Sequence, residues 1–435
     1  MPSLHLHEIL QQVVPYLIDI LGGPNLVTDP EKPSTRPSIQ PMPGGEARAD
    51  GTWLIAHAED TDSTTREVRL ERQSLPFSEL EERLVDHAFK SLSALLRQPH
   101  DGYSVHHRAA LVGSVLDIAV ARLLRGHPRK CAYLHDVLRV MKELTLRTYE
   151  GRPCTSGFIS VSRPYKGWLD SLAQAGFALL RLRPSIGVTS RFFESPLTYR
   201  YVDGKQAAYV VQSPNNCVGI LRLDSNATVT AEDIAIHEHF RRALLPTGRR
   251  SFGLFVNDNS EMDVLANDSI LRWRRGQWRL FEPCRLKDIF RTYIDSEAAS
   301  ALLAAITLRL SYSRIGTPIL LRDRTAPAVP VLRHIDESVI AQSLRNHLLG
   351  VSLEVAHRSG LLDAALTSDG LTIIGPGGLL EDSGALVVLS NSRSATGGGR
   401  TAAAESASRF GLIVKVSEDG PIQLWQRERL VLQYG

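Results

Sequence analysis

Three consecutive glycines and an arginine are the residues of this sequence whose types and spacing best fit a chemical task. Gly397, Gly398 and Gly399 let backbone amides approach an anion closely and tolerate the positive φ angles of a concave amide nest. Arg400 adds a forked donor, and a helix beginning at Gly399 or Thr401 would direct its positive end at the same anion. The pattern predicts a site for one phosphate group, although glycine-arginine turns also serve as plain connectors.

Two histidine-containing clusters are candidates for metal binding. His127, Cys131 and His135 recur every four residues and could share one face of a helix. His237 and His239 are two residues apart, and on the helix predicted around them their side chains would diverge. We favour structural roles for both clusters.

A hairpin predicted over 268–285 combines arginines with tryptophans. Such a mixture can stack on bases and contact backbone phosphates. The alternative, which we favour, is an amphipathic hairpin with its tryptophans packed inward and its arginines in water. The residues concerned are Arg272, Trp273, Arg274, Arg275, Trp278 and Arg279, with the turn near Arg275 and Gly276.

Composition limits the class of protein. The 435 residues are 43% hydrophobic and 22% charged, which is typical of a globular chain of two or three domains. A net charge of +3 is mild, so nucleic acid is not an expected partner. We find no apolar run long enough to cross a membrane and no signal peptide, so we expect no membrane association and a cytoplasmic location. Four widely spaced cysteines argue against a disulfide framework or a zinc ribbon.

Residue patterns along the chain predict an α/β fold with a mixed, α+β sheet. The prediction comprises a mostly helical N-terminal region, a mixed middle region and a C-terminal nucleotide-binding domain. Its segments are an N-terminal helix over 1–22, a linker or loop-rich segment over 23–76, a helical region over 77–150, a mixed α/β region over 151–297 and the C-terminal domain over 298–435.

The order of elements in 298–435 resembles the diadenylate cyclase domain of DisA-type proteins. In that family a helix leads to an Ile-Gly-Ala strand, which Ile315, Gly316 and Thr317 match here. An Asp-Gly-Ala motif, a glycine-rich apolar strand and an Arg-His-Arg phosphate motif follow. A strand ending in Val-Ser-Glu then completes the order, and "VSEDG" stands in that place at 416–420. The chain is most similar to the divergent branch of probable nucleotide sensors of the DACNV type.

Asp363, Ala364 and Ala365 stand where that family has Asp-Gly-Ala. The family's aspartate positions a metal ion and the attacking 3′ hydroxyl, so the resemblance implies catalysis and Mg²⁺ or Mn²⁺ binding at Asp363 if the enzyme is active. Asp369 and Gly370 also spell Asp-Gly, but they lie between two apolar runs. We predict a hairpin turn there, with strands over 361–368 and 371–380, and therefore assign the motif to Asp363.

Gly398, Gly399 and Arg400 stand where the family has Arg-His-Arg, whose side chains hold the triphosphate and the departing pyrophosphate. Losing an arginine and a histidine removes charge-assisted contacts worth roughly 2 to 4 kcal/mol each in a transition state, which would lower a rate by several powers of ten. Nucleotide binding would be weakened less, because the glycine amides, Arg400 and the start of the predicted helix remain. The nucleotide or phosphate contacts implied are Gly316, Thr317, Ala364, Ala365, Gly397, Gly398, Gly399, Arg400 and Thr401.

The resemblance implies a sensor of a nucleotide or dinucleotide in bacterial signalling, with antiphage defence as the setting. A homo-oligomer or a partner defence protein is the implied assembly. One alternative is an active nucleotidyltransferase that makes a cyclic or linear dinucleotide from nucleoside triphosphates with Mg²⁺ or Mn²⁺. A second alternative is a non-catalytic interaction scaffold.

Overall fold

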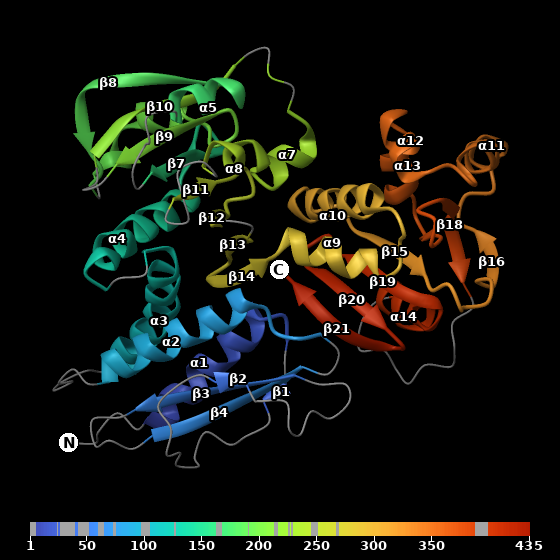
Figure 1. Cartoon of the computed structure of the whole chain (residues 1–435), viewed down its shortest axis with the longest axis horizontal. Coiled ribbons are helices and arrows are strands. Elements are labelled where there is room, and N and C mark those ends of the chain that lie inside the picture. The colour runs from blue at the N-terminus through green and yellow to red at the C-terminus, as the bar shows by residue number, and fades with distance from the viewer. Residues whose placement is uncertain are drawn as a thin grey trace. The chain divides into compact units, whose positions relative to one another are not determined.

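The computed structural model has a mixed α/β architecture (Figure 1). By contact clustering the chain forms two compact units. The N-terminal unit comprises Met1–Val229 and His239–Leu280, and the C-terminal unit comprises Thr230–Glu238 and Phe281–Gly435. The structure describes residues 6–23, 25–26, 40–41, 52–59, 65–72, 75–96, 105–125, 128–161, 168–189, 191–212, 216–224, 227, 229–244, 251–266, 269–387 and 399–435.

The N-terminal unit begins with a small sheet inside the segment predicted to be a linker. After α1 (Leu6–Ile20), four strands pair in the order β1-β4-β3-β2. Leu54, Ala56, Val68 and Leu70 are fully buried on alternate positions of the two long strands. The proline-rich composition of the preceding residues obscured this two-residue period. The strands are β1 (Asn25–Leu26), β2 (Gln40–Pro41), β3 (Thr52–Glu59) and β4 (Thr65–Arg72).

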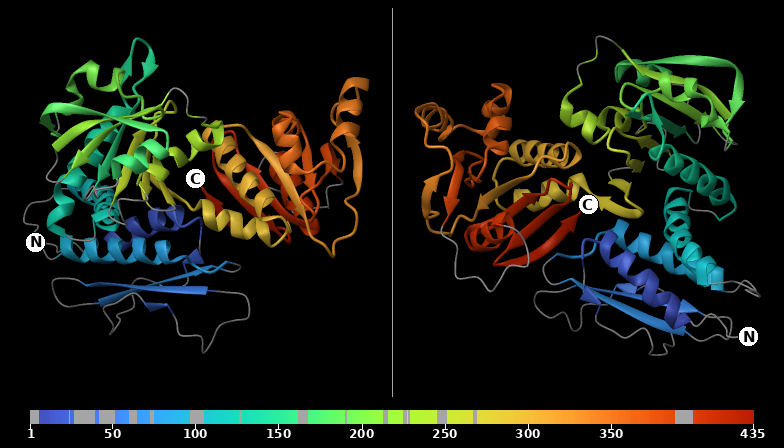
Figure 2. Two further views of the ribbon diagram at one scale, coloured as in Figure 1. Left: turned by 45° about the horizontal axis from the view of Figure 1, so that its top comes forward. Right: turned by 180° about the vertical axis from the view of Figure 1, so that it is seen from behind.

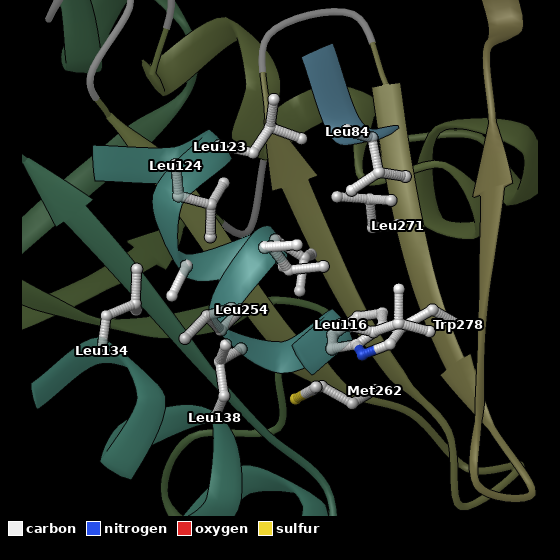
Figure 3. Packing of buried hydrophobic residues seen from close by; sticks show 14 of the residues in the cluster. Leu84, Leu116, Leu123, Leu124, Leu134, Leu138, Leu254, Met262, Leu271 and Trp278 are labelled. Atoms are coloured by element: carbon white, nitrogen blue, oxygen red, sulfur yellow. The ribbon is translucent and has the colours of Figure 1, made fainter. Parts of the chain in front are cut away.

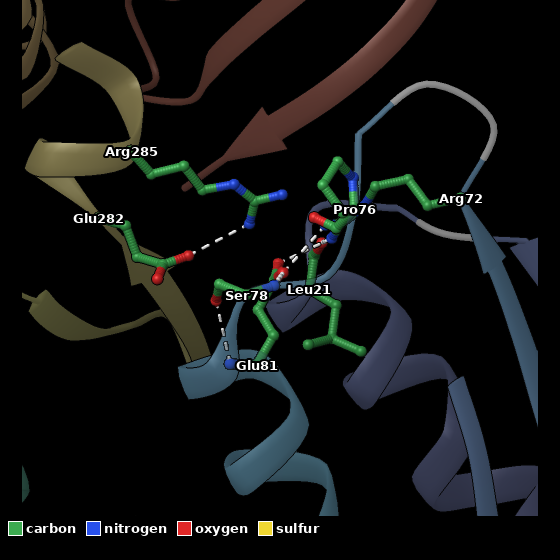
Figure 4. A network of polar contacts seen from close by, with 7 residues as sticks. All are labelled: Leu21, Arg72, Pro76, Ser78, Glu81, Glu282 and Arg285. Carbon is green, nitrogen blue, oxygen red and sulfur yellow. Dashed lines mark hydrogen bonds and ion pairs between the residues drawn. The ribbon is translucent and has the colours of Figure 1, made fainter. Parts of the chain in front are cut away.

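A buried ion pair joins this sheet to the first long helix. Two nitrogens of the Arg72 guanidinium contact the Glu81 carboxylate at 2.7 and 2.9 Å, and Arg72 also donates to the backbone oxygen of Leu21 (Figure 4). The hydroxyl of Ser78 accepts from the Glu81 amide, while the Glu81 carboxylate accepts from the Ser78 amide. The pair therefore fixes the end of α1 and the end of β4 against the start of the next helix.

Three helices occupy the segment predicted to be helical. They are α2 (Glu79–Leu96), α3 (Val105–Arg125) and α4 (Pro128–Thr145). Their apolar residues share one core with the strands of the N-terminal unit, in which Leu116 of α3 lies beside Leu254, Met262 and Trp278 (Figure 3). The apolar residues that recur at helical spacing in the sequence of these three helices are the ones that are buried in the core.

An eight-stranded sheet completes the N-terminal unit, in the order β14-β13-β12-β11-β7-β9-β10-β8. Small elements β5 (Thr148–Tyr149), β6 (Arg152–Pro153), α5 (Trp168–Gln174), η1 (Phe192–Glu194), α6 (Pro196–Arg200) and α8 (Glu238–Leu244) flank it. The strands are β7 (Ser156–Val161), β8 (Phe177–Gly187), β9 (Ala207–Gln212), β10 (Asn216–Leu223), β11 (Phe252–Val256), β12 (Met262–Ala266), β13 (Ser269–Arg274) and β14 (Gln277–Phe281).

The C-terminal unit contains a seven-stranded mixed sheet, whose strands are orange to red in Figure 2. The strand order is β16-β18-β17-β15-β19-β20-β21. The unit begins earlier than the predicted position 298. Its helices are α7 (Ala231–Ala235), α9 (Pro283–Arg291), α10 (Glu297–Tyr312), α11 (Val339–Leu348), α12 (Leu353–Arg358), α13 (Leu361–Thr367) and α14 (Gly399–Ala407), with η3 (Ser408–Phe410). Its strands are β15 (Thr317–Arg322), β16 (Val331–His334), β17 (Leu371–Ile374), β18 (Leu380–Val387), β19 (Gly411–Val416), β20 (Ile422–Gln426) and β21 (Arg429–Tyr434).

The prediction of a strand over 361–368 was wrong. Leu361–Thr367 form helix α13, with Leu362, Ala365 and Leu366 buried. Positions 362, 365 and 366 follow a helical three-to-four-residue spacing that the short apolar run concealed. Asp369 and Gly370 therefore connect a helix to β17 and are not the turn of a hairpin.

Candidate functional site

Helix α14 begins at Gly399, one of the two positions predicted for its start. Gly397 and Gly398 lie outside the described residues, as do the side chains of Arg400 and Thr401. Ala404 and Ala407 of α14 pack into a cluster with Leu320 of β15, Leu371 and Ile373 of β17 and Ile413 of β19. Helix α14 therefore covers the face of the sheet that carries these residues.

The direction of α14 follows from its connection to β19. Strand β19 runs antiparallel to β15, with Gly411 opposite Arg322 and Val416 opposite Thr317. Helix α14 leads through η3 into Gly411 and contacts β19, β15 and β20, so it must run back along the sheet. Its first residue, Gly399, thus lies toward the end of the sheet where β15 and the parallel strand β17 begin.

Helix α13, which carries Asp363, lies on the opposite face of the sheet from α14 (Figure 1). Thr372 alternates with Leu371 and Ile373 along β17, and its hydroxyl donates to the backbone oxygen of Ala365 at 2.8 Å. The two parts of the predicted site are therefore separated by the sheet.

The Asp363 carboxylate forms an ion pair with the guanidinium of Arg309 on α10. Arg309 Nε also lies 2.8 Å from a carboxylate oxygen of Glu232 on α7. Arg309 is 11% exposed, whereas Asp363 is 50% exposed. Asp363 as placed does not fit a metal ligand, because its carboxylate is bonded to the Arg309 guanidinium, whose positive charge would repel a cation. We derive no catalytic step through a metal at this residue.

The other predicted residues serve the packing of α13 on the sheet. The backbone oxygen of Ala365 accepts hydrogen bonds from Ser368 at 2.8 Å and from Ser383 at 2.9 Å, besides that from Thr372. Thr317, which is 1% exposed, donates through its hydroxyl to the backbone oxygen of Leu366. These bonds hold the end of α13 over the starts of β15 and β17.

Gly316 and Ala364 are the remaining predicted contact residues. Gly316 is half-buried and directly precedes β15, so it lies at the same end of the sheet as Gly399 and Asp369. Ala364 is exposed on α13, on the opposite face of the sheet from α14.

Asp369 and Gly370 are the residues that the sequence reasoning set aside. They lie directly before β17, at the same end of the sheet as Gly399. Gly370 has φ +104°, and a Cβ atom there would lie 2.6 Å from the backbone carbon of Gly384, so only glycine fits. Asp369 is exposed. An Asp-Gly pair immediately before an apolar strand was the available signal, and the mistaken strand over 361–368 concealed it.

An ion pair occupies the opposite end of β15. Both Arg322 Nε and Nη2 contact the Glu381 carboxylate of β18, at 2.6 and 2.5 Å, and this bidentate hydrogen bonding raises the pKa of Arg322. On the neighbouring position of β18, the Asp382 carboxylate accepts from His334 Nε2–H at 2.8 Å. The charges of Arg322 and Glu381 therefore neutralise one another at this end of the sheet.

The hairpin of arginines and tryptophans belongs to the N-terminal unit, and Arg275 at its turn is exposed. Trp278 is buried, as predicted, but the expectation that the arginines lie in water was wrong for two of them. Arg272 Nε contacts Asp263 at 2.6 Å, and Arg274 Nε contacts Glu261 at 2.9 Å. Asp263 of the neighbouring strand β12 and Glu261, which directly precedes that strand, are buried carboxylates. They therefore neutralise the charges of Arg272 and Arg274.

The predicted hairpin turn is present, and the two tryptophan rings contact a lysine of helix α4. Arg275 and Gly276 have φ of 46° and 85°, as a two-residue hairpin turn requires. Lys142 lies over the rings of Trp273 and Trp278 at 4.9 and 5.1 Å, and burial lowers its pKa.

His237 and His239 do not form a metal site among the described residues. His237 interrupts the predicted helix with φ 54°, and His239 Nε2–H donates to the Lys205 backbone oxygen at 2.7 Å. His127 and the side chain of Cys131 lie outside the described residues. Within the described ranges, no three His, Cys, Asp or Glu side chains converge as metal ligands, and no helix is long and apolar enough to cross a membrane.

Comparison with protein-family models, curated proteins and solved structures found no match to this chain.

Proposed function

We propose that the C-terminal unit binds a nucleotide or dinucleotide, and that the protein is a nucleotide sensor in bacterial signalling, with antiphage defence as its setting. The observation that supports this proposal is the placement of Gly399, where α14 begins, at the same end of the sheet as Asp369 and Gly370. A helix start offers unpaired amides to a phosphate, and the adjoining glycines and Arg400 add donors. The proposed site differs from the sequence prediction in using Asp369 in place of Asp363.

Titration calorimetry with the full chain tests this proposal. The ligands are ATP, the other nucleoside triphosphates including dTTP, and cyclic dinucleotides. We expect saturable binding of at least one of them. Mass spectrometry of any nucleotide that copurifies with the protein identifies the base. Absence of binding to every ligand in the panel would refute the proposal.

An active nucleotidyltransferase is the second candidate function, favoured by the Asp369-Gly370 pair. The Gly370 conformation excludes other residues, so this turn presents an aspartate in a fixed backbone geometry at the proposed nucleotide site. Incubation with Mg²⁺ or Mn²⁺ and each triphosphate, followed by chromatography and a pyrophosphate assay, separates an enzyme from a sensor. For an enzyme, Asp369→Asn should abolish pyrophosphate release and the matched Asp363→Asn should retain it. If neither the wild type nor Asp363→Asn releases pyrophosphate, and both still bind nucleotide, the protein is a sensor and not an enzyme.

A further inference from the structure

Helix α11 and the adjoining sheet edge carry an exposed apolar surface. Of the residues of α11, only Leu348 is buried. Val339 is 81% exposed and Ile340 is 75% exposed, and Leu332 of strand β16 is 67% exposed. We call this surface the α11 face; its residues are Leu332, Ile335, Val339, Ile340, Leu344 and Leu349.

The α11 face lies at the open edge of the C-terminal sheet. Strand β16 is the terminal strand of that sheet, and the views in Figures 1 and 2 place α11 and β16 together at the same outer edge. Helix α11 contacts the sheet at β18 and buries Leu348. Ile340 and Leu344 continue the four-residue spacing of Leu348, so an apolar stripe that is anchored at one end is left exposed along the rest of the helix.

The area of the α11 face fits a protein partner. Its six apolar side chains expose on the order of 500 Å², which is near the upper end of the largest apolar patches on monomeric proteins. Two such faces packed together would bury on the order of 1,000 Å², which is the lower bound for a specific interface. A second copy of this chain would therefore supply enough apolar area.

The charges around α11 are self-complementary. Asp336 and Glu337 precede the helix, whereas Arg345 and His347 lie in its last turn. When two copies of α11 pack antiparallel about a two-fold axis, the acidic start of each faces the basic end of the other. Asp336 precedes α11, and its backbone oxygen accepts from Arg345 Nη1 of the same chain at 2.6 Å. Within the helix, Ile340, Ser343 and His347 point the same way on a helical projection. An axis between positions 341 and 342 therefore sets the turn that carries Asp336 beside His347 of the other copy.

We propose that the α11 face is the interface of a symmetric dimer of this chain, with the two α11 helices antiparallel. The proposal is independent of nucleotide binding. Opposite ends of the helix match in charge, and the apolar residues between them cover one another. Both features follow from one symmetry operation.

Oligomeric state measured by light scattering after gel filtration tests the proposal. We expect the wild type to have twice the mass of one chain. Ile340→Asp should be monomeric, whereas Asn346→Asp, which adds the same charge to the other side of the helix, should remain dimeric. A monomeric wild type at roughly 100 µM, or a dimeric Ile340→Asp, would overturn the proposal. Thermal melts of both variants show whether the chain remains folded.

Charge exchange and crosslinking test the antiparallel register. His347→Asp should weaken the dimer at least roughly tenfold, and addition of Asp336→Lys should restore it. Ser343→Cys should be joined to its counterpart by a short bifunctional maleimide, because the two positions lie about 10 Å apart across the axis. The neighbouring Gln342→Cys, which points away, should not be joined, and wild type controls for the native cysteines. Equal crosslinking of both variants, or no restoration in the double variant, would contradict this register.

Discussion

Arg400 is the charged residue on which the proposed phosphate site most depends. If the glycines and the start of α14 bind a phosphate, Arg400→Ala removes a charge-assisted hydrogen bond. We expect it to weaken nucleotide binding ten- to a hundredfold, or about 1.5 to 3 kcal/mol. Arg400→Lys keeps the charge but loses the bidentate geometry, so it should also weaken binding. Titrations measure both variants, with thermal melts as the folding control. A change of less than about twofold in Arg400→Ala would show that the phosphate site lies elsewhere.

Gly370 permits a close approach of two backbone segments beside the proposed site. Its φ of +104° is strained for any residue with a Cβ atom, and Gly384 leaves no space for one. We expect Gly370→Ala to lower the free energy of unfolding by about 2 to 4 kcal/mol. Gly360→Ala is the matched control, because Gly360 has φ +74° but open space around it, and should cost about 1 kcal/mol. Equal losses in urea unfolding of the two variants would show that the contact with Gly384 is unimportant.

At the scale of elements, the Arg72–Glu81 pair holds helix α2 against the end of α1. The two side chains are 3% and 1% exposed, so removal of one charge takes away the opposite charge that the buried partner faces. We expect Glu81→Gln to lower the free energy of unfolding by about 3 to 5 kcal/mol. Asp86→Asn on the same helix breaks the solvent-exposed pair with Lys90 and should cost less than about 1 kcal/mol. Chemical denaturation that finds similar costs for both would contradict this account.

The packing of α2 also predicts a dependence of stability on pH. Burial lowers the pKa of His87 below its ordinary value of 6.5. Below pH 6.5 the unfolded chain therefore binds a proton more readily than the folded chain, and the contribution to stability is lost as the pH falls through the two pKa values. We expect melting temperatures to fall on acidification, and to fall less in His87→Gln. If the melting temperatures of the wild type and of His87→Gln fall equally with pH, groups other than His87 cause the pH dependence.

The elements of the C-terminal unit could be predicted wherever apolar spacing was long and regular. Helix α14 and strand β19 follow from the sequence, as does the hairpin around Arg275 in the N-terminal unit. Helix α13 did not, because a seven-residue apolar segment fits a buried strand as well as a helix. That ambiguity moved the candidate aspartate from Asp369 to Asp363, whose partner Arg309 is distant in sequence and has no local signal.

At the scale of the whole molecule, the two units combine residues from separated parts of the chain. Thr230–Glu238 belong to the C-terminal unit although the chain on both sides belongs to the N-terminal unit. A sequence read in consecutive segments could not assign this insertion. The ion pair between Glu232 and Arg309 gives the physical reason, since it binds α7 to α10 within the C-terminal unit.

Hydrogen exchange of the full chain with and without nucleotide tests the central claim most directly. The first amides of α14 have no partners within the helix, so they exchange rapidly until a phosphate accepts from them. We predict that a bound nucleotide slows exchange at Gly399–Thr401 and at Ser368–Leu371 together, because both segments lie at one end of the sheet. Binding that leaves both segments unprotected, or no binding by any nucleotide or dinucleotide in the panel, would contradict the account.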